Sequence, residues 1–265
     1  MNETLRLIHQ RRSVRAYEDR PIERETVDTI INAAMRAPTA GNLMLYSILE
    51  IEDPPIKAKL AQSCDNQPFI AQAPLVLVFL ADYQRWIDAF VAADVPAYCR
   101  ARGETMRLPG EGDLLLACCD ALIAAQTAVI AAESLGVGSC YIGDIMERYE
   151  VHRELLGLPR YAFPVTMVCF GYPTPAARER ALTTRFPQAS VHFRDRYRRL
   201  DEEELFAMLE TRARGRGMEG ALDAGQRTYL RKFAADFTVE MTRSVREAIR
   251  TWTADQEKES GDSVS

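Results

Sequence analysis

Apolar residues recur every three or four positions in several parts of the chain, and this spacing places side chains on one face of a helix. The pattern predicts helices at residues 4–12, 22–37, 55–64, 113–135, 147–156, 201–211 and 225–252. Three other segments have the pattern of strands. Residues 46–51 alternate weakly, whereas 73–81 and 164–170 are almost continuously apolar. Strands of that density are buried on both faces, so we expect a sheet covered by helices.

The predicted helix at 113–135 is apolar on nearly all sides and is closed by Gly136. A helix of this composition lies at the centre of a protein or at a subunit interface. Residues 83–112 have a different character, because they mix aromatic residues with prolines and glycines. We expect a partly helical excursion there, of the kind that forms active-site lids.

No internal repeat and no linker divides the chain. We therefore expect a single domain over residues 1–265, with the excursion at 83–112. A helical extension is expected at about 201–252, and a polar, disordered tail at 253–265.

The charge balance limits the range of partners. The chain has 265 residues, 33 of them basic and 38 acidic, so it lacks the cationic surface that nucleic-acid binding requires. The N-terminus shows no apolar signal core. The apolar runs 75–81 and 114–119 are too short to cross a bilayer core of roughly 30 Å. These features predict a soluble protein with no nucleic-acid partner and no membrane association.

The six cysteines include no CxxC pair, and only three histidines are present. This usage disfavours a metal site and suits reduced, mostly buried thiols in the cytoplasm. Cys118 and Cys119 lie on the apolar helix, where they are expected to be small core residues.

Several catalytic motifs are absent. The chain has no GxSxG and no GxxxxGK[ST], and its glycine cluster at 136–143 follows a helix, which is the wrong context for a dinucleotide fingerprint. The remaining signal is a basic group of Arg11, Arg12, Ser13 and Arg15. Guanidinium groups and a hydroxyl in one turn suit a phosphate monoester. The alternative interpretation is a solvated basic surface patch.

The sequence resembles the FMN-dependent nitroreductases and flavin reductases. The resemblance rests on five stretches in the order that the family has them: RRSVRAYEDRPI, APTAGN, NQPFIAQAPLVLVFLAD, AAESLGVGSCYIGDI and FGYP with RER. These stretches lie at residues 11–22, 37–42, 66–82, 131–145 and 170–180. From first to last they span about two-thirds of the chain.

The resemblance implies an α+β fold with a central, mostly antiparallel sheet flanked by helices, in an intertwined homodimer. It implies tightly bound FMN at the subunit boundary, with NADH or NADPH as electron donor. The expected activity is ping-pong hydride transfer from the nicotinamide to a nitroaromatic, a quinone or a second flavin.

The resemblance also assigns roles to residues. Arg15 would reach the pyrimidine edge of the flavin and stabilise the negative charge that reduction places there, and the N–H of Gly143 would face the hydride-accepting nitrogen. Arg178 and Arg180 would bind the phosphate. The complete set expected to bind the cofactor is Arg11, Arg12, Ser13, Arg15, Thr39, Gln67, Tyr141, Ile142, Gly143, Asp144, Arg178 and Arg180.

Structural roles remain as alternatives for some of these positions. Gly136, Gly138 and Gly143 could be a helix cap and ordinary turns, Gln67 could begin a turn before a proline, and Tyr141 could be core packing.

The chain also departs from the family pattern. Met44 and Leu45 replace a glutamine and a proline that many relatives carry, and the segments 83–112 and beyond 215 are less familiar. Such places set substrate choice. Two alternatives to the expected function therefore stay open: flavin fragmentation or reductive dehalogenation on the same fold, and a non-catalytic FMN sensor. The sequence names neither the physiological acceptor nor a preference between NADH and NADPH.

Overall fold

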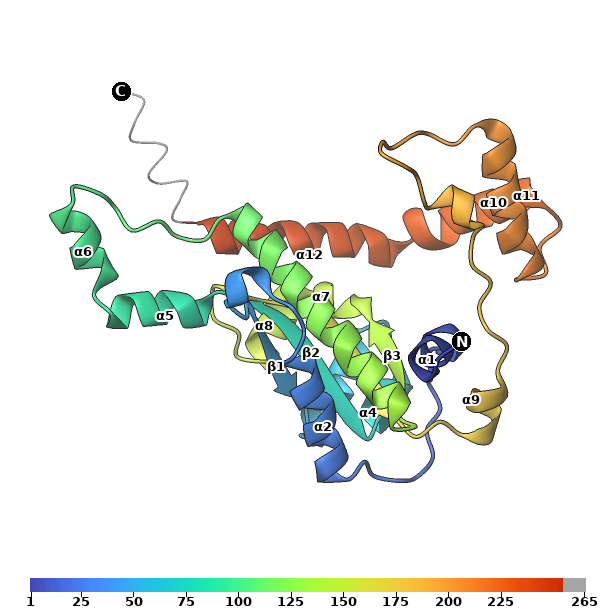
Figure 1. Cartoon of the computed structure of the whole chain (residues 1–265), viewed down its shortest axis with the longest axis horizontal. Helices are drawn as coiled ribbons and strands as arrows, with labels where there is room; N and C mark the ends of the chain where they lie inside the picture. Colours follow the sequence, from blue (N-terminus) through green and yellow to red (C-terminus); the bar gives the residue numbers. More distant parts are fainter. Residues whose placement is uncertain (255–265) are drawn as a thin grey trace. The chain divides into compact units, whose positions relative to one another are not determined.

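The computed structural model describes residues 1–254 and divides them into two compact units (Figure 1). The first unit comprises Met1–Glu179 together with the chain from Glu240 onward, and the second comprises Arg180–Val239. Whether the chain is a single domain stays a prediction. Part of the predicted polar tail at 253–265 lies outside the described residues, and Thr253 instead ends the last helix.

The first unit is built around a four-stranded antiparallel sheet with the order β1-β2-β4-β3. Its strands are β1 (Tyr46–Glu50), β2 (Leu75–Asp82), β3 (Gly138–Ile142) and β4 (Ala162–Gly171). Every residue of β2 and β4 is buried, which explains their nearly continuous apolar sequences. The predicted α+β class and antiparallel sheet are confirmed.

Helices cover both faces of this sheet. On one face, Leu77 and Phe79 of β2 join a core cluster with α7 (Glu111–Ser134) and α2 (Arg24–Ala34), and this cluster also contains Trp252. On the other face, Val76 and Val78 pack in a second cluster with α3 (Pro54–Ser63) and α4 (Pro68–Gln72). Alternate residues of one strand therefore belong to different cores, as the two-residue period of a strand requires.

The helices of the first unit match most of the predicted segments. They are α1 (Glu3–Gln10), α2 (Arg24–Ala34), α3 (Pro54–Ser63), α4 (Pro68–Gln72), α5 (Gln84–Ala92), α6 (Val95–Ala101), α7 (Glu111–Ser134), α8 (Tyr149–Leu155) and α9 (Pro175–Glu179), with 3-10 turns η1 (Ala40–Asn42) and η2 (Gly143–Met146). Gly136 follows α7 with φ of 75°, so its predicted role in closing the helix is confirmed.

The second unit contains η3 (Gln188–Ser190), α10 (Glu202–Arg214), α11 (Ala221–Thr228) and the π turn η4 (Tyr229–Phe233). A capping box starts α10, because Asp201 accepts from the N–H of Glu204 and the Glu204 side chain accepts from the N–H of Asp201. α12 (Asp236–Thr253) begins in this unit and ends in the first.

One predicted helix needs correction, and two elements were not predicted. The segment 225–252 is not one helix, because the wide π turn and a bend at Ala234 and Ala235 interrupt it. The glycine cluster after α7 contains the strand β3, which lacks the length and valine density of β2 and β4. The arginine-rich segment after Pro173 begins with the short helix α9.

α7 also corrects the expectation that every apolar run is too short to cross a membrane. By length and composition alone, it is the one helix among the described residues that could do so. Core helices of soluble proteins pass the same test, and α7 packs against the sheet and α2.

Candidate functional site

The basic segment that follows α1 runs along the free edge of β3. Ser13 forms a parallel bridge with Ser139, the N–H of Val14 donates to the Ser139 carbonyl at 2.9 Å, and Tyr17 bridges to Pro173. Two glycines permit this approach. A Cβ at Gly138 would lie 2.5 Å from Cγ2 of Val14, and one at Gly171 would lie 2.4 Å from Cδ1 of Tyr17. Gly138 is therefore a packing glycine within a strand and not part of a turn.

This arrangement brings the basic side chains close to β3. Burial raises the pKa of the Cys140 thiol, whereas the Arg15 charge, a hydrogen bond from Ser13 and the Arg11 charge lower it. The negative charge of Asp144 raises the pKa of the same thiol. The basic segment and Asp144, which are distant in the sequence, thus both lie near Cys140 on the edge strand β3.

The guanidinium of Arg11 has an unsatisfied donor. Its Nη1 is buried and has no hydrogen-bond partner among the described residues. The same is true of the Ser139 hydroxyl on the adjoining strand. Buried polar atoms are nearly always paired in folded proteins, so each of these two atoms is a candidate contact for a polar ligand. Arg12 is engaged differently, because its guanidinium donates to the Arg178 carbonyl.

Arg15 is exposed, and its guanidinium lies 5.8 Å from the centre of the Phe69 ring on α4. An exposed cation held over an aromatic ring remains available to a ligand on its outer side.

The chain turns sharply where β3 ends in η2. The side chain of Ile142 is buried and packs in the core, so only its backbone could contact a cofactor. Gly143 is exposed, and a Cβ built there would meet no atom within 4 Å, which leaves open space beside its main chain. Tyr141 donates from its hydroxyl to Gln126 at 3.2 Å, and burial raises its pKa to about 12. Tyr141 is therefore tied to α7 as well as lying beside the candidate site.

Gln67 joins η2 from the opposite side. It precedes α4, and its Nε2 donates to the Cys64 carbonyl at 3.0 Å and to Oδ2 of Asp144 at 2.6 Å. Both donors of the amide are thus used, and Oε1 is left to accept from a ligand N–H. Asp65 and Asn66 adopt left-handed backbone angles that make the tight link from α3 to α4. The structure therefore brings Gln67 and Asp144 together, as expected for one site.

Thr39 occupies a turn of its own. Its hydroxyl accepts from the N–H of Met44 at 3.2 Å. The same turn is held by Asp120 of α7, which is buried and accepts from the N–H groups of Ala40 and Leu45 at 3.0 and 3.2 Å. Sequence reasoning missed Asp120. A lone acidic residue within an apolar helix is the signal that could have identified it, since a buried carboxylate needs donors.

The two arginines expected at the phosphate differ in placement. Arg178, on α9, donates from Nε to the Pro173 carbonyl at 3.0 Å and pairs with Glu18 at 3.2 Å. To bind a phosphate, its guanidinium would have to exchange the Glu18 carboxylate for the ligand. Arg180 begins the second unit. Their proposed roles stay predictions.

The residues present at the end of β3 fit an FMN molecule. The unpaired Nη1 of Arg11, the charge of Arg15, the free Oε1 of Gln67 and the open backbone at Gly143 offer donors, a cation and an acceptor around one region. A flavin has both N–H and carbonyl groups on its ring and a phosphate on its side chain. Among the described residues, no group of His, Cys, Asp or Glu is arranged to hold a metal ion.

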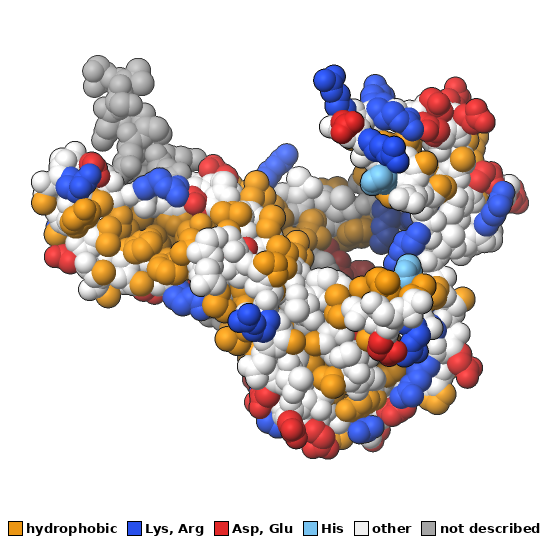
Figure 2. Space-filling model, in the orientation of Figure 1, with side chains coloured by type: hydrophobic (Ala, Val, Ile, Leu, Met, Phe, Trp, Pro, Cys, Tyr) orange, Lys and Arg blue, Asp and Glu red, His pale blue; other side chains and the backbone are white. Residues whose placement is uncertain are grey.

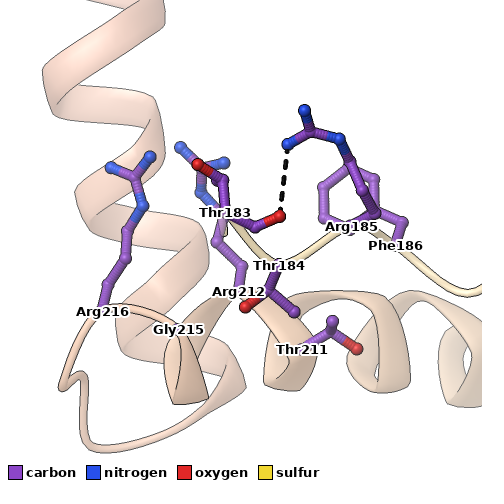
Figure 3. Close-up of a pocket in the computed structure, with 8 residues that line it drawn as sticks. All are labelled: Thr183, Thr184, Arg185, Phe186, Thr211, Arg212, Gly215 and Arg216. Atoms are coloured by element: carbon purple, nitrogen blue, oxygen red, sulfur yellow. Dashed lines mark hydrogen bonds between the residues drawn. The ribbon is translucent and has the colours of Figure 1, made fainter. Parts of the chain in front are cut away.

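A separate cavity of about 310 Å³ lies within the second unit. It is lined by Thr183, Thr184, Arg185, Phe186, Thr211, Arg212, Gly215 and Arg216. The guanidinium groups of its three arginines project on the same side (Figure 3). Arg212 is anchored by its Nε, which donates to the Thr228 hydroxyl at 2.7 Å. Charge and hydroxyl groups in one cavity are suited to an anion.

Residues 8–172 match the Nitroreductase family. The chain belongs to this family. The matched range contains the basic segment, the 38–42 turn, Gln67 and η2, whereas Arg178 and Arg180 lie beyond it. The expected family membership and fold are confirmed.

Characterised relatives and solved structures give the same result. The chain is 34% identical to the FMN reductase [NAD(P)H] of Bacillus subtilis over 79% of this chain and 80% of that one. It is 32% identical to the oxygen-insensitive NADPH nitroreductase of Salmonella typhimurium, over 77% and 79%. Its fold is similar to the NADPH:FMN oxidoreductase of Vibrio harveyi complexed with NAD+, with a TM-score of 0.77, 26% identity and coverage of 94% and 98%.

Proposed function

We propose that this nitroreductase-family protein is an FMN-dependent NAD(P)H oxidoreductase that reduces small organic acceptors such as nitroaromatics, quinones or flavins. The proposal rests on one observation: the basic segment, η2 and Gln67 lie close together at the end of β3. The names of the relatives, which include FMN reductase and NADPH nitroreductase, agree with this activity class.

The residues of the chain have distinct roles in this reaction. Bound FMN would supply the two-electron chemistry that links the nicotinamide to the acceptor. Arg11 and Ser13 would hold polar groups of the cofactor, and Gln67 would accept from a ligand N–H through Oε1. Arg15 places a fixed positive charge beside the region where negative charge develops, and the N–H of Gly143 adds a preorganised donor.

Steady-state turnover tests the activity and separates an enzyme from a sensor. The purified protein, loaded with FMN, is mixed with NADH or NADPH and with menadione or a nitrofuran. We expect sustained oxidation of the nicotinamide with ping-pong kinetics. An FMN-loaded protein that does not turn over any of these acceptors would contradict the proposal.

A second copy of the chain is the partner that we propose for α7. Its outer face exposes Leu115, Leu116, Leu122 and Ile123, although α7 is otherwise a core helix. In Figure 2, hydrophobic side chains gather over the surface that α5 to α7 occupy in Figure 1. A continuous apolar surface of this kind marks an interaction site. The apolar face supports the homodimer that the family resemblance implies.

We propose that the cationic cavity of the second unit binds a small phosphate-like anion. This proposal has its own test. Arg216→Ala removes a guanidinium that lines the cavity, whereas Arg214→Ala removes an exposed neighbour that does not. We expect Arg216→Ala to weaken the binding of inorganic phosphate, measured by titration calorimetry, by roughly tenfold, since a charge-assisted bond is lost. Equal effects of the two substitutions would contradict the assignment.

A cytoplasmic location completes the proposal. The described cysteines are all free, and burial raises the pKa of Cys64 and Cys118 to about 12. Free, protonated thiols of this kind suit a reducing compartment. Cys118 is half-buried and Cys119 is exposed, so the expectation that both are core residues is wrong.

A further inference from the structure

His152 is completely buried on α8, beneath the turn that presents Gly143. Its Nδ1 lies 2.8 Å from the carbonyl oxygen of Ile145, a residue of η2. Its Nε2 lies 2.7 Å from the hydroxyl of Ser63, which is the last residue of α3 and is also buried. The imidazole therefore bridges η2 to the end of α3.

The chemistry of these two contacts fixes the tautomer. A carbonyl oxygen can only accept, so Nδ1 carries the proton and donates to Ile145. In the neutral ring, Nε2 then accepts from the Ser63 hydroxyl. Burial lowers the pKa of His152, which keeps the ring neutral near pH 7.

The same two parts of the chain are joined a second time at the protein surface. Asp144, next to Ile145, accepts from Gln67, which lies shortly after Ser63. A third side chain holds the end of the turn, because the Ser244 hydroxyl on α12 donates to the Met146 carbonyl at 2.7 Å. Consecutive residues of η2 are thus each bound by a side chain from a different element.

We propose that His152 is a positioning residue for flavin reduction, acting through the Ile145 carbonyl to fix the backbone direction at Gly143. This inference rests on the proposed function of the site. His152 touches neither cofactor nor substrate in this account. Its role is to prevent rotation of the peptide groups in η2, so that the Gly143 N–H keeps one orientation. A 3-10 turn has weaker internal hydrogen bonds than an α-helix and needs such external support.

The test compares substitutions that keep or lose the donor at Nδ1. His152→Asn places an amide N–H near the position of Nδ1, so it can still donate to Ile145. His152→Gln places its amide toward Ser63, and His152→Leu fills the space with no donor. Thr253→Val is the matched control, because it removes another buried hydroxyl, which donates to the Ile249 carbonyl at 3.0 Å in the same unit.

Anaerobic stopped-flow reduction at full FMN occupancy is the first measurement. We expect His152→Leu and His152→Gln to slow reduction by roughly tenfold, which corresponds to about 1.4 kcal/mol, and to make the flavin potential more negative. His152→Asn should restore most of the rate. The flavin of Thr253→Val should be reduced at the wild-type rate, even if the thermal midpoint of this variant falls as far as those of the His152 variants.

Amide hydrogen exchange of the FMN-free protein is the second measurement, and it does not depend on the activity. Peptides that cover residues 143–146 should exchange faster in His152→Leu and His152→Gln than in His152→Asn. Unchanged exchange and unchanged reduction in the Leu and Gln variants would overturn the proposal, as would an Asn variant that rescues neither. If the wild-type flavin is not reduced by NAD(P)H, the proposed function fails, whereas the exchange result still decides the positioning role.

Discussion

Gly138, which begins β3, and Gly143, which follows it, have opposite surroundings. They allow an effect on stability to be separated from an effect on flavin reduction. A Cβ at Gly138 would meet Val14 at 2.5 Å, whereas one at Gly143 would meet nothing. We expect Gly138→Ala to lower the free energy of unfolding by about 1–3 kcal/mol through overpacking. Gly143→Ala should change it by less than about 0.5 kcal/mol and yet impair flavin reduction, because the methyl group enters the space beside the N–H. Denaturant unfolding and stopped-flow reduction measure the two effects. Normal reduction by Gly143→Ala would remove this residue from the site.

Arg15 and Arg20 offer a similar comparison for charge. Both are exposed and held over aromatic rings, Phe69 for Arg15 and Tyr172 for Arg20. Arg15→Ala should make the flavin potential more negative and slow hydride acceptance even with excess FMN, because the developing charge loses its nearest cation. Arg20→Ala should leave both unchanged. Spectroelectrochemistry at full occupancy checks the potential, and an unshifted value for Arg15→Ala would show that its charge does not act on the ring.

Glu147 is expected to make stability depend on pH. It is buried, its Oε1 has no partner among the described residues, and burial beside Asp144 raises its pKa from 4.5 to about 7. The folded state thus favours the protonated acid. This contribution to stability is complete below pH 4.5 and is lost as the pH rises through about 7.

The variant Glu147→Gln should therefore become more stable relative to the wild type as the pH rises. Between pH 4 and pH 8 the difference in unfolding free energy should shift in favour of the variant by about 1–3 kcal/mol. Glu154→Gln, at an exposed position on α8, serves as the control and should show no such trend. A pH-independent difference for Glu147→Gln would mean that folding leaves the pKa of Glu147 unchanged.

At the scale of elements, the sequence predicts best where one local pattern decides the structure. β2 and α7 have dense, regular apolar patterns, and both appear close to their expected bounds. β3 was missed because its glycine, Gly138, serves a contact with Val14, a residue far away in the sequence. The break between η4 and α12 was missed because the helical spacing of apolar residues continues across the π turn.

The candidate site follows the same rule. The basic segment and Gln67 could be chosen from their resemblance to family motifs, and the structure places them beside η2. Asp120, Ser63 and His152 act through tertiary contacts with backbone groups of distant segments. Asp120 left one sequence signal, an acidic residue within an apolar helix, but no spacing in the sequence records the contacts of Ser63 and His152, so these two could only be found in the folded chain.

At the scale of the whole molecule, the exposed face of α7 predicts an assembly. Leu122→Asp places a charge in the centre of the proposed dimer interface, and burying an unpaired charge is costly. We expect this variant to be a folded monomer by light scattering and to bind FMN more weakly. Val151→Asp is the control, because Val151 is similarly exposed, at 41% against 46% for Leu122, but lies on α8. A wild-type protein that is monomeric with FMN bound would contradict the dimer.

Anaerobic titration of the FMN-loaded protein with NADPH tests the central claim most directly. The absorbance of the bound flavin should bleach with a stoichiometric amount of NADPH or NADH and should return when menadione is added. That result would establish the cofactor, the hydride donor and the transfer to an acceptor in a single experiment. A protein that refuses FMN, or one whose bound flavin stays oxidised in excess NADPH and NADH, would contradict the account.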